Sequence, residues 1–205
     1  MNYENFVSSK RLSTKYFGFE VEIDKVSPVL FDFQKQIVQW ALKLGRAAIF
    51  ADTGLGKTGM QLTWASHIAN KTGGNVLILA PLCVAHQTVN EGKKFDVEVN
   101  YCRSQDQVKS GVNITNYEML KNFDVSTFSG IVLDESSILK SYMGKTKREI
   151  IEACQAVEYR LACTATPSPN DYLELGNHAE FLGIMPSNEM IMRFFQNDTM
   201  EAGTY

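Results

Sequence analysis

The segment ADTGLGKT, from Ala51 to Thr58, has the residue types and the spacing of a phosphate-binding loop, although alanine stands where that pattern has its first glycine. Gly54 and Gly56 permit the backbone angles that turn successive N–H groups toward one point, and such a nest at a helix N-terminus binds phosphate. Lys57 can neutralise the β- and γ-phosphates, and the Thr58 hydroxyl can ligate Mg²⁺. The alternative is a glycine turn beside a solvated lysine. We expect phosphate contacts from Thr53, Gly54, Leu55, Gly56, Lys57 and Thr58.

Two acidic residues end a second apolar run, GIVLDE, at 130–135. Asp134 can hold Mg²⁺ through water, and Glu135 can polarise the attacking water. An Asp-Glu pair after a strand can also cap a helix N-terminus. Beside a phosphate-binding loop we favour catalysis, with Lys57, Asp134 and Glu135 as catalytic residues and with Thr58 and Asp134 as metal ligands.

A third polar segment, Thr164-Ala-Thr166-Pro167, stands at the end of the apolar run that begins RLAC at 160. Its hydroxyls can hydrogen-bond the acidic pair and report whether a γ-phosphate is present, and the proline stops the strand. By itself, a segment of two threonines and a proline after a strand is more often a plain turn. Its position after the other two motifs favours a nucleotide-contacting role for Thr164 and Thr166.

These three segments need elements that bring them together. The apolar runs are of strand length and do not alternate with polar residues, as expected of parallel strands covered on both faces. They are found at 47–52, 76–81, 112–117, 130–135 and 160–166, and 97–102 is a further candidate. Helical spacing between them, with Ile37, Trp40, Ala41 and Leu44 on one face and Met60, Trp64 and Ile68 on another, predicts an α/β fold with helices on both faces of the sheet. Ligands of such folds lie beyond the carboxyl ends of the strands.

Composition fits one globular domain. The chain has 205 residues, 44% of them hydrophobic and 21% charged, with a net charge of −3. The small negative charge excludes an overall basic field, so contacts to a polyanion must be local. The four cysteines form no CxxC pair, and neither a leader peptide nor a long apolar span is visible, so we expect a cytoplasmic protein without a membrane segment.

In this order the motifs ADTGLGKT, DESS and TATP resemble motifs I, II and III of superfamily 2 helicases and translocases, the group of DEAD-box, DEAH-box and Swi/Snf-like ATPases. The sequence as a whole resembles the helicase-like ATPases that phages and prophages encode. The resemblance implies a P-loop NTPase with a RecA-like parallel sheet, and it implies ATP and Mg²⁺ as cofactors and nucleic acid, in particular DNA, as partner.

Further segments carry the same resemblance. LFDFQKQIVQW is similar to the glutamine motif, which implies that Gln34 reads the adenine edge. APLCVAHQ, ITNYEML and DESSILKS are similar to motifs Ia, Ib and an extended motif II, which implies nucleic-acid contacts. These are expected from Pro81, Thr115, Asn116 and Lys140.

Two departures from the family pattern matter. Ser137 stands where a DEAH protein has histidine, so this motif lacks the histidine that would link it to a second domain. The family hydrolyses ATP between two RecA-like domains, and this chain has room for the first alone. We therefore expect an N-terminal arm at 1–30, a RecA-like domain at 31–183 and a tail at 184–205 leading to a second domain outside this chain.

Three observations leave alternatives open. The run Lys140, Lys145, Lys147 and Arg148 could follow a phosphate backbone or be a solvated face. Tyr16, Phe17 and Phe19 could stack on adenine or pack the arm onto the domain. As to function, the motor domain of a DNA helicase or double-strand translocase competes with a nucleotide kinase and with a nucleotide-dependent assembly module that does not turn over.

Overall fold

The computed structural model describes residues 15–140 and 145–195. Its centre is a parallel six-stranded sheet with the order β1-β6-β5-β2-β4-β3. The strands are β1 Arg46–Phe50, β2 Val76–Ala80, β3 Val99–Tyr101, β4 Val112–Asn116, β5 Gly130–Asp134 and β6 Tyr159–Thr164. All six apolar runs are therefore strands, as predicted, and the shortest is the candidate at 97–102.

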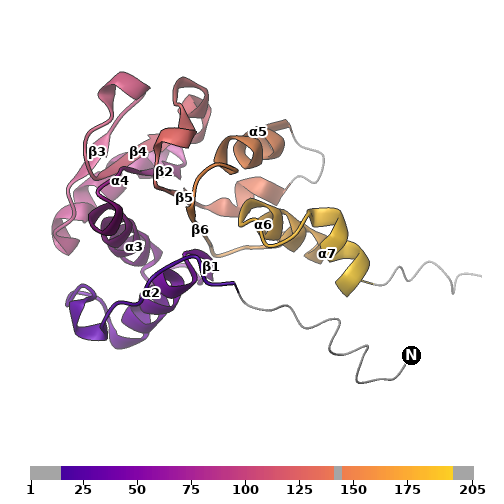
Figure 1. The fold of residues 1–205 in the computed structure, drawn as a ribbon, viewed down its shortest axis with the longest axis horizontal. Coiled ribbons are helices and arrows are strands. Elements are labelled where there is room, and N and C mark those ends of the chain that lie inside the picture. Colours follow the sequence, from indigo (N-terminus) through magenta and orange to yellow (C-terminus); the bar gives the residue numbers. More distant parts are fainter. Residues whose placement is uncertain (1–14, 141–144, 196–205) are drawn as a thin grey trace, which may run out of the picture.

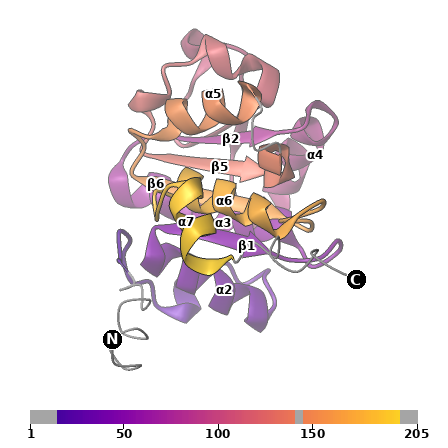
Figure 2. The same cartoon turned by 90° about the vertical axis from the view of Figure 1, so that its right-hand side faces the viewer.

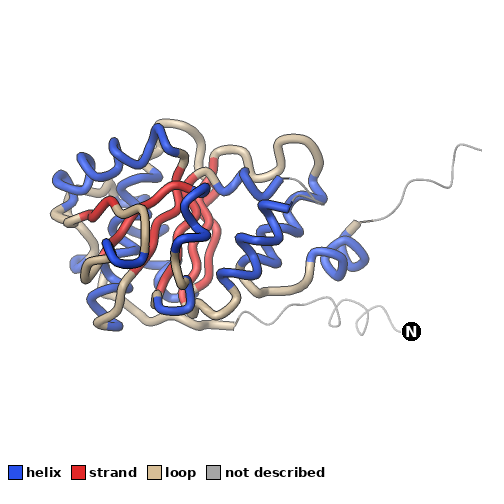
Figure 3. Tube along the Cα trace, turned by 90° about the horizontal axis from the view of Figure 1, so that it is seen from above, coloured by secondary structure: helices blue, strands red, loops and turns tan. Residues whose placement is uncertain are grey.

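Helices cover both faces of this sheet, which confirms the predicted α/β architecture (Figures 1 and 3). One face carries α2 Asp32–Leu44, α3 Lys57–Thr72 and α4 Leu82–Gly92, and the other carries α5 Lys145–Cys154 and α6 Leu175–Phe181, with α7 Ser187–Phe194 packed on α6 (Figure 2). Short 3-10 helices are η1 Ile23–Lys25, η2 Lys93–Phe95, η3 Gln105–Gln107, η4 Tyr117–Asn122, η5 Val125–Thr127, η6 Ser136–Lys140 and η7 Tyr172–Glu174.

Each face of the sheet has its own apolar core because side chains alternate along a strand. Ile78 and Val132 face α3, whereas Leu79 and Leu133 face α5 and α6. Every residue of β2, β4 and β5 is buried, as a parallel sheet covered on both sides requires.

The helical predictions are confirmed for α3 and partly wrong for α2. Met60, Trp64 and Ile68 are fully buried on α3. On α2, Trp40 is 50% exposed, because this helix packs inward through Gln34, Val38, Ala41 and Leu42 and leaves Trp40 on its flank. The flank lies beside β1, an edge strand that no further described strand covers.

Residues 17–30 of the expected arm pack onto the domain. The amides of Phe17 and Phe19 donate to the carbonyls of Leu44 and Leu42, and Phe19 meets Tyr159 edge to face. These aromatic residues therefore lie at the C-terminal end of α2, whereas Gln34 lies at its N-terminal end, about 15 Å away along the helix axis. Phe17 and Phe19 therefore follow the packing alternative, whereas Tyr16 is 61% exposed; the distance from Gln34 disfavours adenine stacking by these residues.

The expected tail, 184–205, contains α7, whose first residue, Ser187, is buried against α6. Residues 196–205 of that tail and residues 1–14 of the arm lie outside the described residues. In the part of the chain that the structure describes, no helix is long and apolar enough to cross a membrane.

Candidate nucleotide site

The phosphate-binding loop joins β1 to α3 at the carboxyl edge of the sheet. Gly54 and Gly56 have φ values of 84° and 78°, in the left-handed region that disfavours other residues. At Gly56 space is limiting as well, because an added Cβ would lie 2.3 Å from the Gln34 amide nitrogen. The two glycines are therefore required for the shape of the loop.

Backbone donors of this loop point to an anion site. Among the described residues, the amides of Gly54, Gly56, Lys57 and Thr58 donate to no protein group. The Lys57 ammonium donates to the carbonyls of Ala51 at 3.0 Å and Asp52 at 3.3 Å. Unpaired N–H groups, a helix N-terminus and a cation in one loop are the donor set that a polyphosphate requires. Thr53 and Leu55 are exposed at the rim of the same loop.

Gln34 connects α2 to this loop. Its side-chain oxygen accepts from the Phe31 amide at 2.9 Å, and its side-chain nitrogen donates to the Leu55 carbonyl at 2.9 Å. The carboxamide retains one N–H and one lone pair for a further partner. Phe31 and Phe33, which are stacked with centroids 6.2 Å apart, flank it and are 71% and 46% exposed.

The acidic pair lies across from the loop at the end of β5. Asp134 is 4% exposed, and burial raises the pKa of its carboxyl above the usual value, while the Gln61 amide and the Lys57 charge oppose that shift. Glu135 is left-handed with a φ of 54°. Asp134, the predicted Mg²⁺ ligand, thus ends β5, and Glu135, the predicted base, forms the turn that follows; we call these two residues the acidic turn.

The threonine segment reaches the acidic pair, as the sequence predicted. The Thr164 hydroxyl donates to Glu135 Oε2 at 3.3 Å, and the Thr166 amide donates to the same hydroxyl oxygen at 3.1 Å. The Ala51 amide donates to the Thr164 carbonyl at 3.2 Å, which ties this segment to the phosphate loop. Strand register explains the meeting, since Phe50 pairs with Thr164 and Asp134 with Cys163.

Sequence reasoning missed Gln61. This residue is fully buried on α3, one turn beyond Thr58, and its amide has no hydrogen-bond partner in the described part of the chain. It is near enough to lower the pKa of Asp134, but no hydrogen bond of normal length joins the two side chains. A polar residue at a buried helical position was the available signal.

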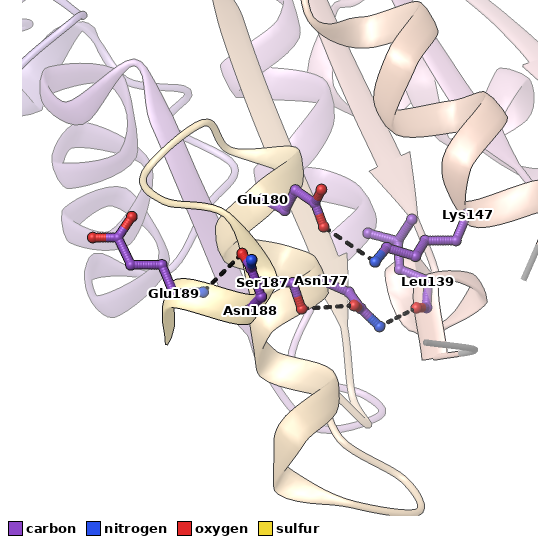
Figure 4. A network of polar contacts seen from close by, with 7 residues as sticks. All are labelled: Leu139, Lys147, Asn177, Glu180, Ser187, Asn188 and Glu189. Carbon is purple, nitrogen blue, oxygen red and sulfur yellow. Dashed lines mark hydrogen bonds and ion pairs between the residues drawn. The ribbon is translucent and has the colours of Figure 1, made fainter. Parts of the chain in front are cut away.

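The 3-10 helix η6, which comes directly after the acidic pair, is held from α6 (Figure 4). The Asn177 side chain donates to the Leu139 carbonyl at 2.7 Å, and the Ser187 hydroxyl donates to Asn177 Oδ1 at 3.4 Å. Nearby, Ser136 Oγ lies 3.1 Å from Nε2 of His178, another α6 residue that the sequence did not single out. Two residues of one helix thus fix both ends of η6, which follows Glu135 directly.

Pro81, Asn116 and Lys140, three of the four expected nucleic-acid contacts, line one open pocket of about 470 Å³. Glu135 and Ser137 line it too, so the pocket borders the acidic turn. Thr115 is fully buried and does not line this pocket.

The basic run near motif II does not form one continuous surface. Lys140 and Arg148 are exposed, but Lys147 is 6% exposed and pairs with Glu180 at 3.1 Å. The Lys145 side chain lies outside the described residues.

Comparison with known proteins identifies the family. Residues 33–202 match the SNF2-related domain. The chain is 28% identical over 175 residues to putative protein p41 of Acyrthosiphon pisum secondary endosymbiont phage 1, covering 73% of this chain and 38% of that protein.

Solved structures show the same fold. The UvsW helicase from bacteriophage T4 superposes with a TM-score of 0.61 at 15% identity, over 91% of this chain and 66% of that one. The Sulfolobus solfataricus SWI2/SNF2 ATPase core in complex with dsDNA gives 0.64 at 20% identity, over 89% of this chain and 40% of that one. The chain thus spans between 38% and 66% of the length of these three relatives. It belongs to the SNF2-related domain family and has the fold of the first RecA-like domain of a superfamily 2 helicase.

Proposed function

We propose that the chain is the ATP-binding motor domain of an ATP-dependent DNA helicase or double-strand DNA translocase in the cytoplasm of a bacterial or phage-infected cell. The observation that carries the proposal is the convergence of unpaired loop amides, the acidic turn and the threonine segment at one edge of the sheet. Hydrolysis requires a second RecA-like lobe outside this chain.

The roles follow from the contacts. Loop residues 53–58 bind the phosphates, and Lys57 exchanges its two carbonyl partners for phosphate oxygens. Thr58 and Asp134 hold Mg²⁺, which when bound neutralises charge on the phosphates. Glu135 accepts a proton from the attacking water, and Thr164 and Thr166 link that carboxylate to the phosphate loop.

The base of the nucleotide would bind next to Gln34. Its remaining N–H and lone pair match the paired donor and acceptor of the adenine edge. The exposed Phe31–Phe33 pair lies beside it and offers an aromatic surface there. Because the Leu55 carbonyl already binds Gln34, adenine recognition and loop position depend on the same side chain.

Nucleic acid would follow the pocket lined by Pro81, Asn116 and Lys140. With a net charge of −3, the domain has no overall attraction for DNA, so this binding is local and weakens with salt. The partial coverage of the relatives supports a second lobe that completes the track.

The test is steady-state ATPase of this chain and of a version extended through a second RecA-like domain, each with and without duplex DNA. We expect both forms to bind Mg-ATP and the extended form alone to hydrolyse it rapidly and to respond to DNA. A facing arginine contributes about 10³ to 10⁵ in rate in related P-loop enzymes.

Three results would count against the proposal. A 205-residue chain that matches the extended protein and is stimulated by DNA contradicts the two-lobe mechanism. Tight ATP binding without turnover in the extended form assigns an assembly module instead, and phosphorylation of an acceptor molecule assigns a kinase.

A further inference from the structure

The peptide bond between Asp134 and Glu135 is held in an unusual orientation. Glu135 has a φ of 54°, and among the described residues one other non-glycine residue, Asp96, has a positive φ. The left-handed region is unfavourable for a side chain of this size because Cβ approaches the neighbouring carbonyl oxygen. Something in the surrounding structure must therefore hold this turn.

Tyr117 contacts that peptide directly. Its hydroxyl donates a 2.7 Å hydrogen bond to the Asp134 carbonyl. Because a peptide unit is planar, the direction of this carbonyl and the φ of Glu135 change together when the plane rotates. A bond that fixes the carbonyl thus also fixes the left-handed conformation of the next residue.

The far end of Glu135 is held separately. Its Oε2 accepts from the Thr164 hydroxyl at 3.3 Å. This is longer than the roughly 3.0 Å at which the usual range of O–H···O bonds ends, so the contact is weak. The shorter Tyr117 bond on the backbone side is the stronger restraint by geometry. Rotation of the peptide plane would carry the carboxylate away from Thr164.

Tyr117 has the properties of a permanent donor. Burial of its hydroxyl, followed by the nearby Asp134 charge, raises the pKa of the phenol well above 10, so it stays protonated at the pH of any assay. The ring itself is partly exposed and lines the pocket that Asn116 and Lys140 share. One side chain thus joins the wall of that pocket to the backbone of the acidic turn.

We infer that Tyr117 is a positioning residue for the base: its hydroxyl holds the Asp134–Glu135 peptide plane and thereby keeps the Glu135 carboxylate beside Thr164. The inference rests on the proposed ATPase function. It assigns Tyr117 an effect on the chemical step and none on nucleotide binding, because none of the loop donors contacts it.

The test is Tyr117→Phe in the full-length protein, which removes one oxygen and keeps the ring. We expect kcat for ATP to fall about tenfold, the rate change that corresponds to one hydrogen bond of ordinary net strength. The KM for ATP and the affinity for a non-hydrolysable ATP analogue should remain at parental values, and the loss of this one hydrogen bond should lower the melting temperature by no more than about 4 °C. The matched control is Tyr159→Phe, because the Tyr159 hydroxyl makes no hydrogen bond to the described residues, and it should leave all four quantities unchanged.

Each outcome decides the inference. If the parental protein hydrolyses ATP and Tyr117→Phe does so at the same kcat, Tyr117 does not position Glu135, while the proposed function stands. If analogue affinity falls together with kcat, or if the melting temperature falls by more than about 4 °C, the hydroxyl has a general structural role and the inference is wrong. A parental protein without ATP turnover would overturn the proposed function and this inference with it.

Discussion

Replacing Lys57 by alanine separates nucleotide binding from folding. In the structure the ammonium contacts the carbonyls of Ala51 and Asp52, and no carboxylate lies within salt-bridge distance of it among the described residues. Lys57 is thus a partly exposed cation held by two carbonyls and by no opposite charge among the described residues. We expect a large loss of affinity with a small change in stability.

The loss of affinity follows from the bond that the lysine can make to phosphate. A hydrogen bond between charged groups contributes about 1.5 to 3 kcal/mol. At the upper end, which fits a doubly contacted polyphosphate, this corresponds to a dissociation constant raised about 100-fold.

The change in stability is a difference between two opposing terms. Two lysine–carbonyl bonds, neither of them fully buried, are lost and together contribute about 1 kcal/mol. Against this, a cation is removed from the first turn of α3, where the helix dipole disfavours it by about 0.3 to 1 kcal/mol. The net effect is below about 1 kcal/mol, a melting shift of no more than about 4 °C for a domain of this size.

Calorimetric titration with Mg-ATP and thermal melting measure the two quantities. Lys71→Ala is the matched control, because this lysine occupies the last turn of the same helix, where the dipole favours a cation. It should leave ATP affinity unchanged. Parental affinity in Lys57→Ala would refute the assignment of the loop, and a melting shift above 10 °C would show that Lys57 is a structural residue.

Three further variants test other parts of the site and its support. Glu135→Gln should retain Mg-ATP affinity and abolish turnover, because it removes the base and spares Asp134; turnover at the parental rate in a phosphate-release assay would exclude Glu135 from the mechanism. Arg160→Met should lower the free energy of unfolding by about 3 kcal/mol in urea titrations, because the buried guanidinium donates three hydrogen bonds to carbonyls near the ends of α5 and α6. The control Arg46→Met removes one hydrogen bond to a carbonyl and should lower it by about 1 kcal/mol. Equal losses in the two variants would contradict this account. His178→Gln tests a pH effect. Burial lowers the pKa of His178 in the folded protein below its usual value of 6.5, so the unfolded chain binds the proton more readily than the folded protein does. The free energy of unfolding therefore falls as the pH drops from about 7.5 to about 5.5. The variant should lose less stability over that interval than the parental protein, and an equal loss would remove His178 from the acid response.

Consecutive residues made the phosphate loop predictable. Loop shape depends on the left-handed angles of Gly54 and Gly56, and Lys57 and Thr58 follow at positions fixed by the start of the helix. The positions of the acidic and threonine segments were predictable for a related reason. Parallel strands end at one edge, so motifs that follow such strands meet there.

Helix faces were predicted less well. The spacing of Ile37, Trp40 and Leu44 was compatible with more than one buried face of α2. In the structure the fully buried face is the one that contains Val38 and Leu42. The sequence placed Lys147 in a run of basic residues, but in the structure this residue is buried and pairs with Glu180 of α6. Periodicity gives the width of an apolar stripe, whereas the neighbouring helices decide which residues it covers.

The sequence by itself determined the fold class, the loop and the order of the motifs, because each depends on residues close together in the chain. Only the tertiary structure showed that Gln61 lies beside Asp134, that Tyr117 binds the Asp134 carbonyl and that His178 reaches Ser136. The partners are 73 residues apart in the first pair, 17 in the second and 42 in the third, so no local sequence pattern joins them. Strand order and the packing of helices on the sheet bring them together, and those depend on the whole chain.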